Sequence, residues 1–382
     1  MTPLSLYIHW PFCVSKCPYC DFNSRVLPSA LEEKRWEDAY LTELSHYAVR
    51  LPDLEIATIY FGGGTPSLMQ PQTIAAILNK IAALWRVQQN CEITLEANPS
   101  SSEIGKFQAF KAAGVNRLSL GVQALDDASL RFLGRAHDAH AAREALESAA
   151  KTFDRFSFDL IYGRAGQTPV AWEAELGEAL TFGAKHMSLY QLTIEEGTVF
   201  HKRAARETLT APDDAAAQMY EATQEIMAAA GLPAYEISNH AAVGQESRHN
   251  LTYWHYDDYV GIGAAAHGRF VEEGKRYTTE NHRNPERWLQ QVGTAGHGRA
   301  EETILGTETA KREALMMGLR LVAGIDKAAW AAKFIAPLEN YIAQHKCSIL
   351  AGEGLLVDDK TALRATPKGL ERLNAVLAFL MG

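Results

Sequence analysis

Short runs of β-branched and aromatic residues alternate with longer helical segments over the first half of the chain. Six of these runs predict buried strands, at residues 6–10, 57–61, 92–97, 117–122, 157–161 and 186–194. After the first run, Trp36, Tyr40, Leu44 and Tyr47 recur at spacings of three and four, which places them on one helix face. Alternating strands and helices predict a parallel sheet, and six or more such units predict an α/β fold that is either a barrel or a partial (β/α)6 barrel.

The alternation fades after about residue 200. A helix predicted over 213–230 ends at Gly231 and Pro233, and an irregular polar and aromatic stretch follows at 235–267. From about Thr307 the pattern is helical, with a hairpin-like segment at 354–364 and a last helix from Pro367. We therefore expect a barrel over 1–235, an irregular region over 236–306 that completes it on the ligand side, and a small C-terminal helical domain with a β wing over 307–382.

Composition and charge narrow the class of protein. Hydrophobic residues make up 47% of the 382 residues and charged residues 22%, which is typical of a soluble globular protein. The net charge of −9 argues against a nucleic-acid partner, because phosphate binding needs clustered Lys and Arg. The opening MTPLSLYIHWPF carries no Lys or Arg and is a poor signal peptide, and no apolar run is long enough to span a bilayer. We expect a cytoplasmic protein without a membrane span.

Polar or glycine-rich signals stand at the end of nearly every predicted strand. Function in such barrels lies at the carboxyl ends of the strands, so their recurrence there predicts a binding site. They are a cysteine triad, Gly62–Thr65, Glu96, Gln123, Asp159 and Gln191.

The cysteine triad follows the first predicted strand directly. Cys13, Cys17 and Cys20 place three thiols on one tight loop, whereas Cys91 and Cys347 stand alone and are expected in the core. A tight cluster of thiols in a reducing compartment suggests metal before disulfide. Three thiolates would leave one iron of an iron–sulfur cluster open to an amine and a carboxylate. A zinc site with His9 as fourth ligand is the alternative, although no second Cys-x-x-Cys knuckle is present.

Gly62, Gly63 and Gly64 follow the second predicted strand. Glycines let the backbone approach a ligand closely and expose its N–H and C=O groups. A phosphate-binding loop is the rival interpretation, but its Lys-Ser/Thr ending is missing here.

Ordered motifs over essentially the whole chain resemble a known family. YIHWPFC, CPYCDF, YFGGGTPS, LEANP, GVQ and FDLIYG together resemble the radical S-adenosylmethionine superfamily and, within it, the oxygen-independent coproporphyrinogen oxidase group. The resemblance implies a [4Fe–4S] cluster on the three cysteines and bound S-adenosylmethionine (SAM). It implies cofactor contacts at Tyr7, Tyr19, Gly63, Gly64, Thr65, Glu96, Gln123, Arg135 and Asp159.

Physical roles can be attached to some of these implied contacts. Arg135 suits the cofactor's carboxylate, while Glu96 and Asp159 suit ribose hydroxyls or the sulfonium charge. Taken singly, each could equally be a cap or a surface ion pair. One departure concerns the loop after FDLIYG, where Arg164-Ala165-Gly166-Gln167 stands in place of the family's Leu-Pro-Gly-Gln. We expect this loop near the mouth of the pocket.

Two features separate the branches of this group. Phe22 occupies the position where the oxidases carry a fourth cysteine, and only twelve residues precede Cys13, so we expect no porphyrinogen turnover and assign no catalytic residue. The string from His249 to Trp254, HNLTYW, resembles the signature of the haem-chaperone branch, the HemW proteins. That branch implies haem as a further ligand and haem-accepting proteins, such as respiratory cytochromes, as partners.

The HNLTYW string carries the haem prediction. An imidazole can ligate haem iron, and Tyr253 and Trp254 offer flat apolar surface to a porphyrin. A histidine beside two aromatics is also an ordinary core feature. We therefore predict haem binding at His249, Tyr253 and Trp254, with other ligands left open at nearby histidines, namely His240, His255 and His267.

Other functions stay open beside the chaperone. One is coproporphyrinogen III dehydrogenase, which decarboxylates two propionate side chains through a 5′-deoxyadenosyl radical, and another is a radical enzyme of unknown substrate. A homodimer coupled to cluster assembly is a further expectation to be tested.

Overall fold

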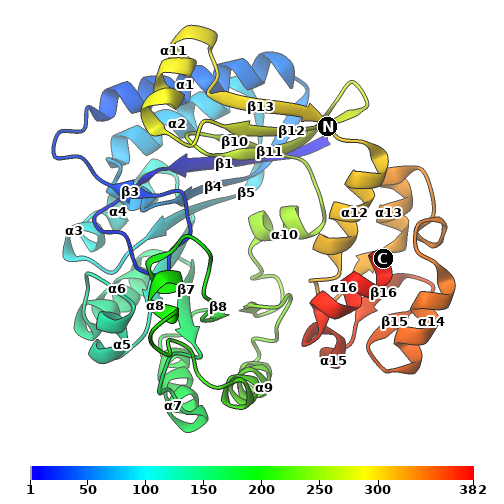
Figure 1. The fold of residues 1–382 in the computed structure, drawn as a ribbon. Coiled ribbons are helices and arrows are strands. Elements are labelled where there is room, and N and C mark those ends of the chain that lie inside the picture. Colours follow the sequence, from blue (N-terminus) through cyan, green and yellow to red (C-terminus); the bar gives the residue numbers. More distant parts are fainter. Residues whose placement is uncertain (1) are drawn as a thin grey trace.

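A computed structural model describes residues 2–382, without the side chain of Ser101. Its main element is an eleven-stranded sheet in the order β13-β12-β11-β10-β1-β4-β5-β6-β7-β8-β9. The central run is parallel throughout and curves around an interior (Figure 1), which confirms the predicted partial barrel. Its strands are β1 (Thr2–Trp10), β4 (Leu54–Gly63), β5 (Arg86–Ala97), β6 (Arg117–Gln123), β7 (Arg155–Tyr162) and β8 (His186–Gln191).

Helices cover the outer face of these strands (Figure 1). The predicted face of α1 is confirmed, since Trp36, Tyr40, Leu44 and Tyr47 are all 2% exposed or less. Their burial against the sheet drives this helix into place, because its mixed sequence has no other long apolar stripe. The helices are α1 (Glu33–Arg50), α2 (Pro71–Leu84), α3 (Ser101–Ile104), α4 (Phe107–Ala113), α5 (Asp127–Phe132), α6 (Ala139–Thr152), α7 (Pro169–Leu180), α8 (Val199–Ala204) and α9 (Asp213–Ala229).

The region over 236–306, expected to be irregular, is largely regular. Strand β9 (Asn239–Ala241) pairs antiparallel with β8, and β10 (Tyr259–Ile262) pairs parallel with β1. The sheet then continues antiparallel through β11 (His267–Glu272), β12 (Lys275–Asn281) and β13 (Arg299–Ile304), with α10 (Arg248–Trp254) and α11 (Pro285–Ala295) between strands. These strands are hard to predict from the sequence because they are short and one face is exposed. Strand β13, for example, has no buried residue.

A buried carboxylate fixes this added sheet to the barrel. Glu43 of α1 is fully buried and accepts hydrogen bonds from the backbone N–H of Gly263 (2.9 Å) and Gly298 (2.6 Å). It also accepts from Trp288 Nε1 (3.0 Å) and Asn281 Nδ2 (3.1 Å). Burial raises the pKa of Glu43 to about 7 despite these donors.

The C-terminal part has its own hydrophobic core. Apart from Tyr256, the fully buried residues of this core among those described come from positions 310–380. No helix among residues 2–382 is both long enough and apolar enough to cross a bilayer. The elements are α12 (Thr307–Gly318), β14 (Ile325–Asp326), α13 (Lys327–Phe334), α14 (Gln344–Gly352), β15 (Leu356–Asp358), β16 (Ala362–Ala365), α15 (Pro367–Leu370) and α16 (Leu373–Met381).

Candidate functional site

The three cysteines lie on a closed loop at the carboxyl end of β1. The short strands β2 (Phe12–Cys13) and β3 (Arg25–Val26) pair in parallel and close the base of this loop. Lys16 Nζ donates across it to the carbonyl of Phe22 (3.1 Å), and the N–H of Phe200 donates to the carbonyl of Pro18 (2.9 Å). The loop is therefore fixed by contacts to its main-chain carbonyls, and neither of these contacts involves a thiol.

All three cysteines line one cavity of about 540 Å³ inside the barrel. Each is a free thiol, and burial raises the pKa of Cys13 and of Cys20. Most of the other predicted cofactor contacts line the same cavity: Tyr19, Gly63, Gly64, Thr65, Glu96, Gln123, Arg135 and Asp159. The carboxyl ends of the parallel strands thus bring together residues that are spread over about 150 positions of sequence.

Glu96 is held at the end of β5 by two donors. Its carboxylate accepts from Tyr60 Oη (2.8 Å) and from the backbone N–H of Gly63 (3.1 Å). Burial, together with a smaller contribution from the nearby carboxylate of Asp159, raises the pKa of Glu96 to about 7. Burial likewise raises the pKa of Asp159 to about 6. A cationic ligand in the cavity would favour the ionised form of both groups.

Arg135 supplies positive charge beside the cysteine loop. Its Nη1 donates to Cys17 Sγ (3.4 Å) and its Nη2 to the carbonyl of Gly121 (2.7 Å). Asn98 accepts a second bond from the same nitrogen. A guanidinium at this position suits both thiolates and the carboxylate of an amino acid.

The glycine segment is required first by the packing of the protein itself. Gly63 has φ +111°, and a Cβ at Gly64 would lie 2.5 Å from the carbonyl oxygen of Phe12. The end of β4 can therefore lie against the cysteine loop only where side chains are absent. This contact brings the backbone of Gly63 and Gly64 into the cavity wall.

The arrangement of His9 does not suit the zinc alternative. Its Nδ1 bonds Tyr7 Oη (3.0 Å) and its Nε2 bonds the carbonyl of Asn23 (3.2 Å), so both ring nitrogens are occupied. Among residues 2–382, no three His, Cys, Asp or Glu side chains are grouped to hold a single metal ion. A cluster of several irons suits three separated thiols better, since each thiolate binds a different iron.

Tyr7 lies outside the cavity lining although it was predicted as a cofactor contact. Its ring stacks on that of Tyr60, which does line the cavity, with 6.2 Å between ring centroids. The loop 164–167, expected near the cavity mouth, also lies outside this lining, because Arg164 pairs instead with Glu175 of α7.

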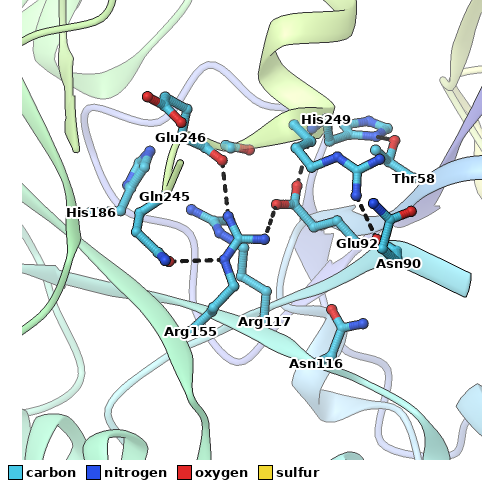
Figure 2. A network of polar contacts seen from close by, with 12 residues as sticks. Thr58, Asn90, Glu92, Asn116, Arg117, Arg155, His186, Gln245, Glu246 and His249 are labelled. Atoms are coloured by element: carbon cyan, nitrogen blue, oxygen red, sulfur yellow. Dashed lines mark hydrogen bonds and ion pairs between the residues drawn. The ribbon is translucent and has the colours of Figure 1, made fainter. Parts of the chain in front are cut away.

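The HNLTYW string forms helix α10, which is held by the barrel's own polar groups. The N–H of His249 donates to Glu92 (3.1 Å), and Ser247 caps the helix by accepting from the N–H of Asn250 (3.3 Å). An acidic side chain at a helix N-terminus is stabilising. Glu92 also pairs with Arg155 at 2.8 Å, as Figure 2 shows.

His249 is buried and both of its ring nitrogens are bonded. Its Nδ1 lies 2.7 Å from Thr58 Oγ1, and its Nε2 lies 2.7 Å from Tyr253 Oη. Thr58 donates its own hydroxyl to Ser5, so it accepts from His249 Nδ1–H, and Nε2 accepts from Tyr253. Burial lowers the pKa of His249 to about 3, which keeps the ring neutral.

Tyr253 and Trp254 do not form one flat surface. Tyr253 meets Tyr259 edge to face, with 4.7 Å between centroids, and lies outside the cavity lining. Trp254 lines a second hollow of about 480 Å³, between α10 and the C-terminal part, together with Trp330 and Phe334. His255, which is exposed, lies at this hollow as well.

Sequence reasoning missed several residues of the cavity wall. They are polar, and they come from strands, from the residue after β5 or from α10: Tyr60, Asn98, Arg117, Ser119, His186, Ser188 and Asn250. The signal for those on strands was a polar residue at alternate positions of a predicted buried strand, as at 117 and 119.

Comparisons with known proteins identify the family of this chain. The sequence model described as "Radical SAM superfamily" matches residues 7–176, and that described as "HemN C-terminal domain" matches 307–371. "Heme chaperone HemW" of Bacillus subtilis is 33% identical over 99% of both chains. The chain belongs to the radical SAM superfamily, in the HemW branch.

This HemW-branch protein is also similar to a mitochondrial relative and to one solved structure. "Radical S-adenosyl methionine domain-containing protein 1, mitochondrial" of Mus musculus is 40% identical over 100% of this chain and 88% of its own. The solved structure of coproporphyrinogen III oxidase (HemN) from Escherichia coli has a TM-score of 0.83 at 22% identity, over 99% of this chain and 90% of that chain. At that identity the likeness shows the fold. Superfamily membership implies a [4Fe–4S] cluster and SAM, and the cavity provides thiols, a guanidinium and carboxylates suited to both.

Proposed function

We propose that this protein is a haem chaperone that binds haem, carries a [4Fe–4S] cluster with SAM, and passes haem to acceptor proteins such as respiratory cytochromes. The observation that carries this proposal is the place of α10 in the cavity wall. His249 stacks on Tyr60 with 4.9 Å between ring centroids, and Tyr60 donates to Glu96. The motif of the haem-chaperone branch is therefore in direct contact with the predicted cofactor pocket.

The cluster and cofactor would be held by residues already described. Cys13, Cys17 and Cys20 would bind three irons, with the fourth iron open to the amine and carboxylate of SAM. Arg135 would face the carboxylate, and Glu96 would face positive charge. Such a cluster supplies one electron at a time when it is bound.

Haem ligation has two candidate positions on α10 and the turn that follows. His249 could ligate iron through Nε2 only if the hydrogen bond from Tyr253 were released. His255 is exposed beside the Trp254 hollow and needs no such change. Soret and electron paramagnetic resonance spectra of His249→Ala and His255→Ala, each compared with the unmutated protein, would identify the ligand.

One experiment separates the chaperone from the dehydrogenase. The cluster is reconstituted without oxygen, and the protein receives coproporphyrinogen III, SAM and a reductant, while a parallel sample receives haem. A stoichiometric shifted Soret band without protoporphyrinogen IX supports the chaperone, and transfer to an apocytochrome then tests delivery. Sustained formation of protoporphyrinogen IX would instead make the protein a dehydrogenase.

Two further parts of the proposal concern the protein in the cell. We propose a cytoplasmic location and a homodimer that forms with cluster assembly. Fractionation tests the first. Light scattering of the apo and reconstituted protein tests the second, because a dimer coupled to the cluster would appear only after reconstitution.

A further inference from the structure

The inner end of the barrel cavity carries a buried arginine that makes no ion pair. Glu96 and Asp159 line the same cavity, and the charge of Arg117 partly offsets the rise in the pKa of both, but neither carboxylate bonds to it. Arg117, the first residue of β6, is 3% exposed and lines the cavity. Its Nη2 donates to Ser157 Oγ (3.0 Å), and among residues 2–382 no carboxylate oxygen lies within 4.0 Å of its side-chain nitrogens. A guanidinium keeps its charge in a protein, and a buried charge is strongly unfavourable unless it is paired.

The nearest arginine shows what a compensated guanidinium looks like in this fold. Arg155 lies opposite Arg117 in the register of β7 and β6. It pairs with Glu92 at 2.8 Å and donates to Gln245 (3.1 Å) and to the carbonyl of Glu246 (3.0 Å), as Figure 2 shows. Glu92 thus forms an ion pair with Arg155 and accepts a hydrogen bond from the N-terminus of α10. Arg117, which lies beside Arg155 in Figure 2, has a hydrogen bond to the hydroxyl of Ser157 instead of an ion pair.

Two further polar groups line the cavity with Arg117. His186 of β8 bonds Tyr235 Oη through Nε2 (2.9 Å), while its buried Nδ1 has no partner among the described residues. Burial lowers the pKa of His186 well below its ordinary value, so the ring adds no positive charge. Asn250 of α10 contributes an amide. A cation, a neutral imidazole with one unpartnered nitrogen and an amide are suited to an anionic group with several acceptor atoms.

We propose that Arg117 binds a carboxylate of the ligand that enters the barrel, and that this carboxylate is a haem propionate. The second half of the inference rests on the proposed haem-chaperone function, with haem bound in the barrel cavity rather than in the Trp254 hollow. A guanidinium matches a carboxylate through two parallel hydrogen bonds, and a buried pair of this kind gives strong selectivity.

The carboxylate of SAM is the other source of the same chemistry, and the strand geometry argues against it. Arg135, which stands beside the cysteine loop, donates to the carbonyl of Gly121. Gly121 lies four residues beyond Arg117 on β6, which corresponds to about 13 Å of strand. The two arginines are therefore anchored at different levels of the strand, and Arg135 is the one beside the loop whose iron would bind the amino acid. The cavity therefore has one cationic end for the cofactor and another for a second ligand.

The test uses the reconstituted holoprotein with two probes, ferric haem and its dimethyl ester, in which both propionates are esterified. Soret titrations give the two dissociation constants. Loss of a buried charged partner costs at least about thirtyfold in affinity, so we expect haem to bind about thirtyfold or more tightly than the ester. Arg117→Gln should bind both probes equally, at the affinity of the ester. Arg248→Gln is the matched control, since its guanidinium donates to the carbonyl of Asn90 outside the cavity and should leave the preference intact.

Each outcome bears on a separate statement. If haem binds without preference over its ester, or if Arg117→Gln keeps the preference, propionate recognition by Arg117 is overturned while haem binding stands. If neither probe binds stoichiometrically, the proposed function fails. Equilibrium dialysis with SAM should give the same affinity for Arg117→Gln as for the unmutated protein; a loss there would assign Arg117 to the cofactor and overturn the inference. The comparison of haem with its ester needs no variant, so a poorly folding Arg117→Gln leaves it intact.

Discussion

Replacing Glu96 by Gln should make the apoprotein's stability less dependent on pH. Burial raises the pKa of Glu96 from its ordinary value of 4.5 to about 7, so the folded protein resists ionisation of this carboxyl. Below pH 4.5 the group is protonated in both the folded and the unfolded chain, and its burial carries no charge penalty. As pH rises to about 7 the unfolded chain ionises first, and the free energy of unfolding falls; above that pH the loss stays constant.

The size of this effect on stability follows from the pKa shift of Glu96. Each pKa unit corresponds to about 1.4 kcal/mol, so a shift of this size amounts to about 3 kcal/mol at pH 8. Glu96 lines a cavity that water can enter, which reduces the value to about 2 kcal/mol. The amide also loses one hydrogen bond, at Tyr60 or Gly63, which costs about 1 kcal/mol at every pH. The free energy of unfolding of the variant, relative to that of the unmutated protein, should therefore rise by about 2 kcal/mol between pH 5 and pH 8.

Urea unfolding of the apoprotein at the two pH values measures this shift, and SAM affinity provides a second readout. Glu96→Gln should weaken SAM binding, and in the unmutated protein binding should weaken as pH falls below about 7, because protonated Glu96 offers no charge. Glu43→Gln is a matched control, since Glu43 has the same raised pKa but does not line the cavity of the three cysteines, so SAM affinity should not change. A stability difference that is the same at pH 5 and pH 8 would refute the reasoning.

Three other predictions follow from particular contacts. Gly64→Ala should destabilise the protein by about 1–3 kcal/mol and reduce iron loading, because its Cβ would meet the Phe12 carbonyl; Gly177→Ala on α7, which has open space, should keep full iron content, measured by iron assay after reconstitution. Tyr253→Phe should free His249 Nε2 at a cost of about 1 kcal/mol, and an unchanged Soret spectrum with haem would count against His249 as the iron ligand. Cys17→Ser should abolish the absorbance of the reconstituted cluster while Cys91→Ser, a buried thiol away from the cavity, should retain it; equal spectra would contradict the assignment.

Much of the cluster and cofactor site could be predicted before the structure. Glu96, Gln123 and Asp159 each stand at or near the end of a strand pattern, and parallel strands bring their carboxyl ends to one side of the sheet. A local pattern was therefore enough to predict that residues far apart in sequence would meet. The same reasoning did not predict strands β10 to β13. These strands are short and half-exposed, and they are stabilised by pairing with distant residues rather than by a local hydrophobic period.

The sequence by itself determined the cysteine spacing, the six parallel strands and the family, because these depend on near neighbours and on a repeated period. Only the tertiary structure decided which polar groups are already satisfied. His249, one of several candidate haem ligands in the sequence, has both ring nitrogens engaged by Thr58 and Tyr253. In the sequence Arg117 resembles any other charged residue, yet in the structure it is buried and makes no ion pair, while the neighbouring Arg155 pairs with Glu92. Hydrogen-bond and charge satisfaction depend on contacts between distant segments, which no local pattern records.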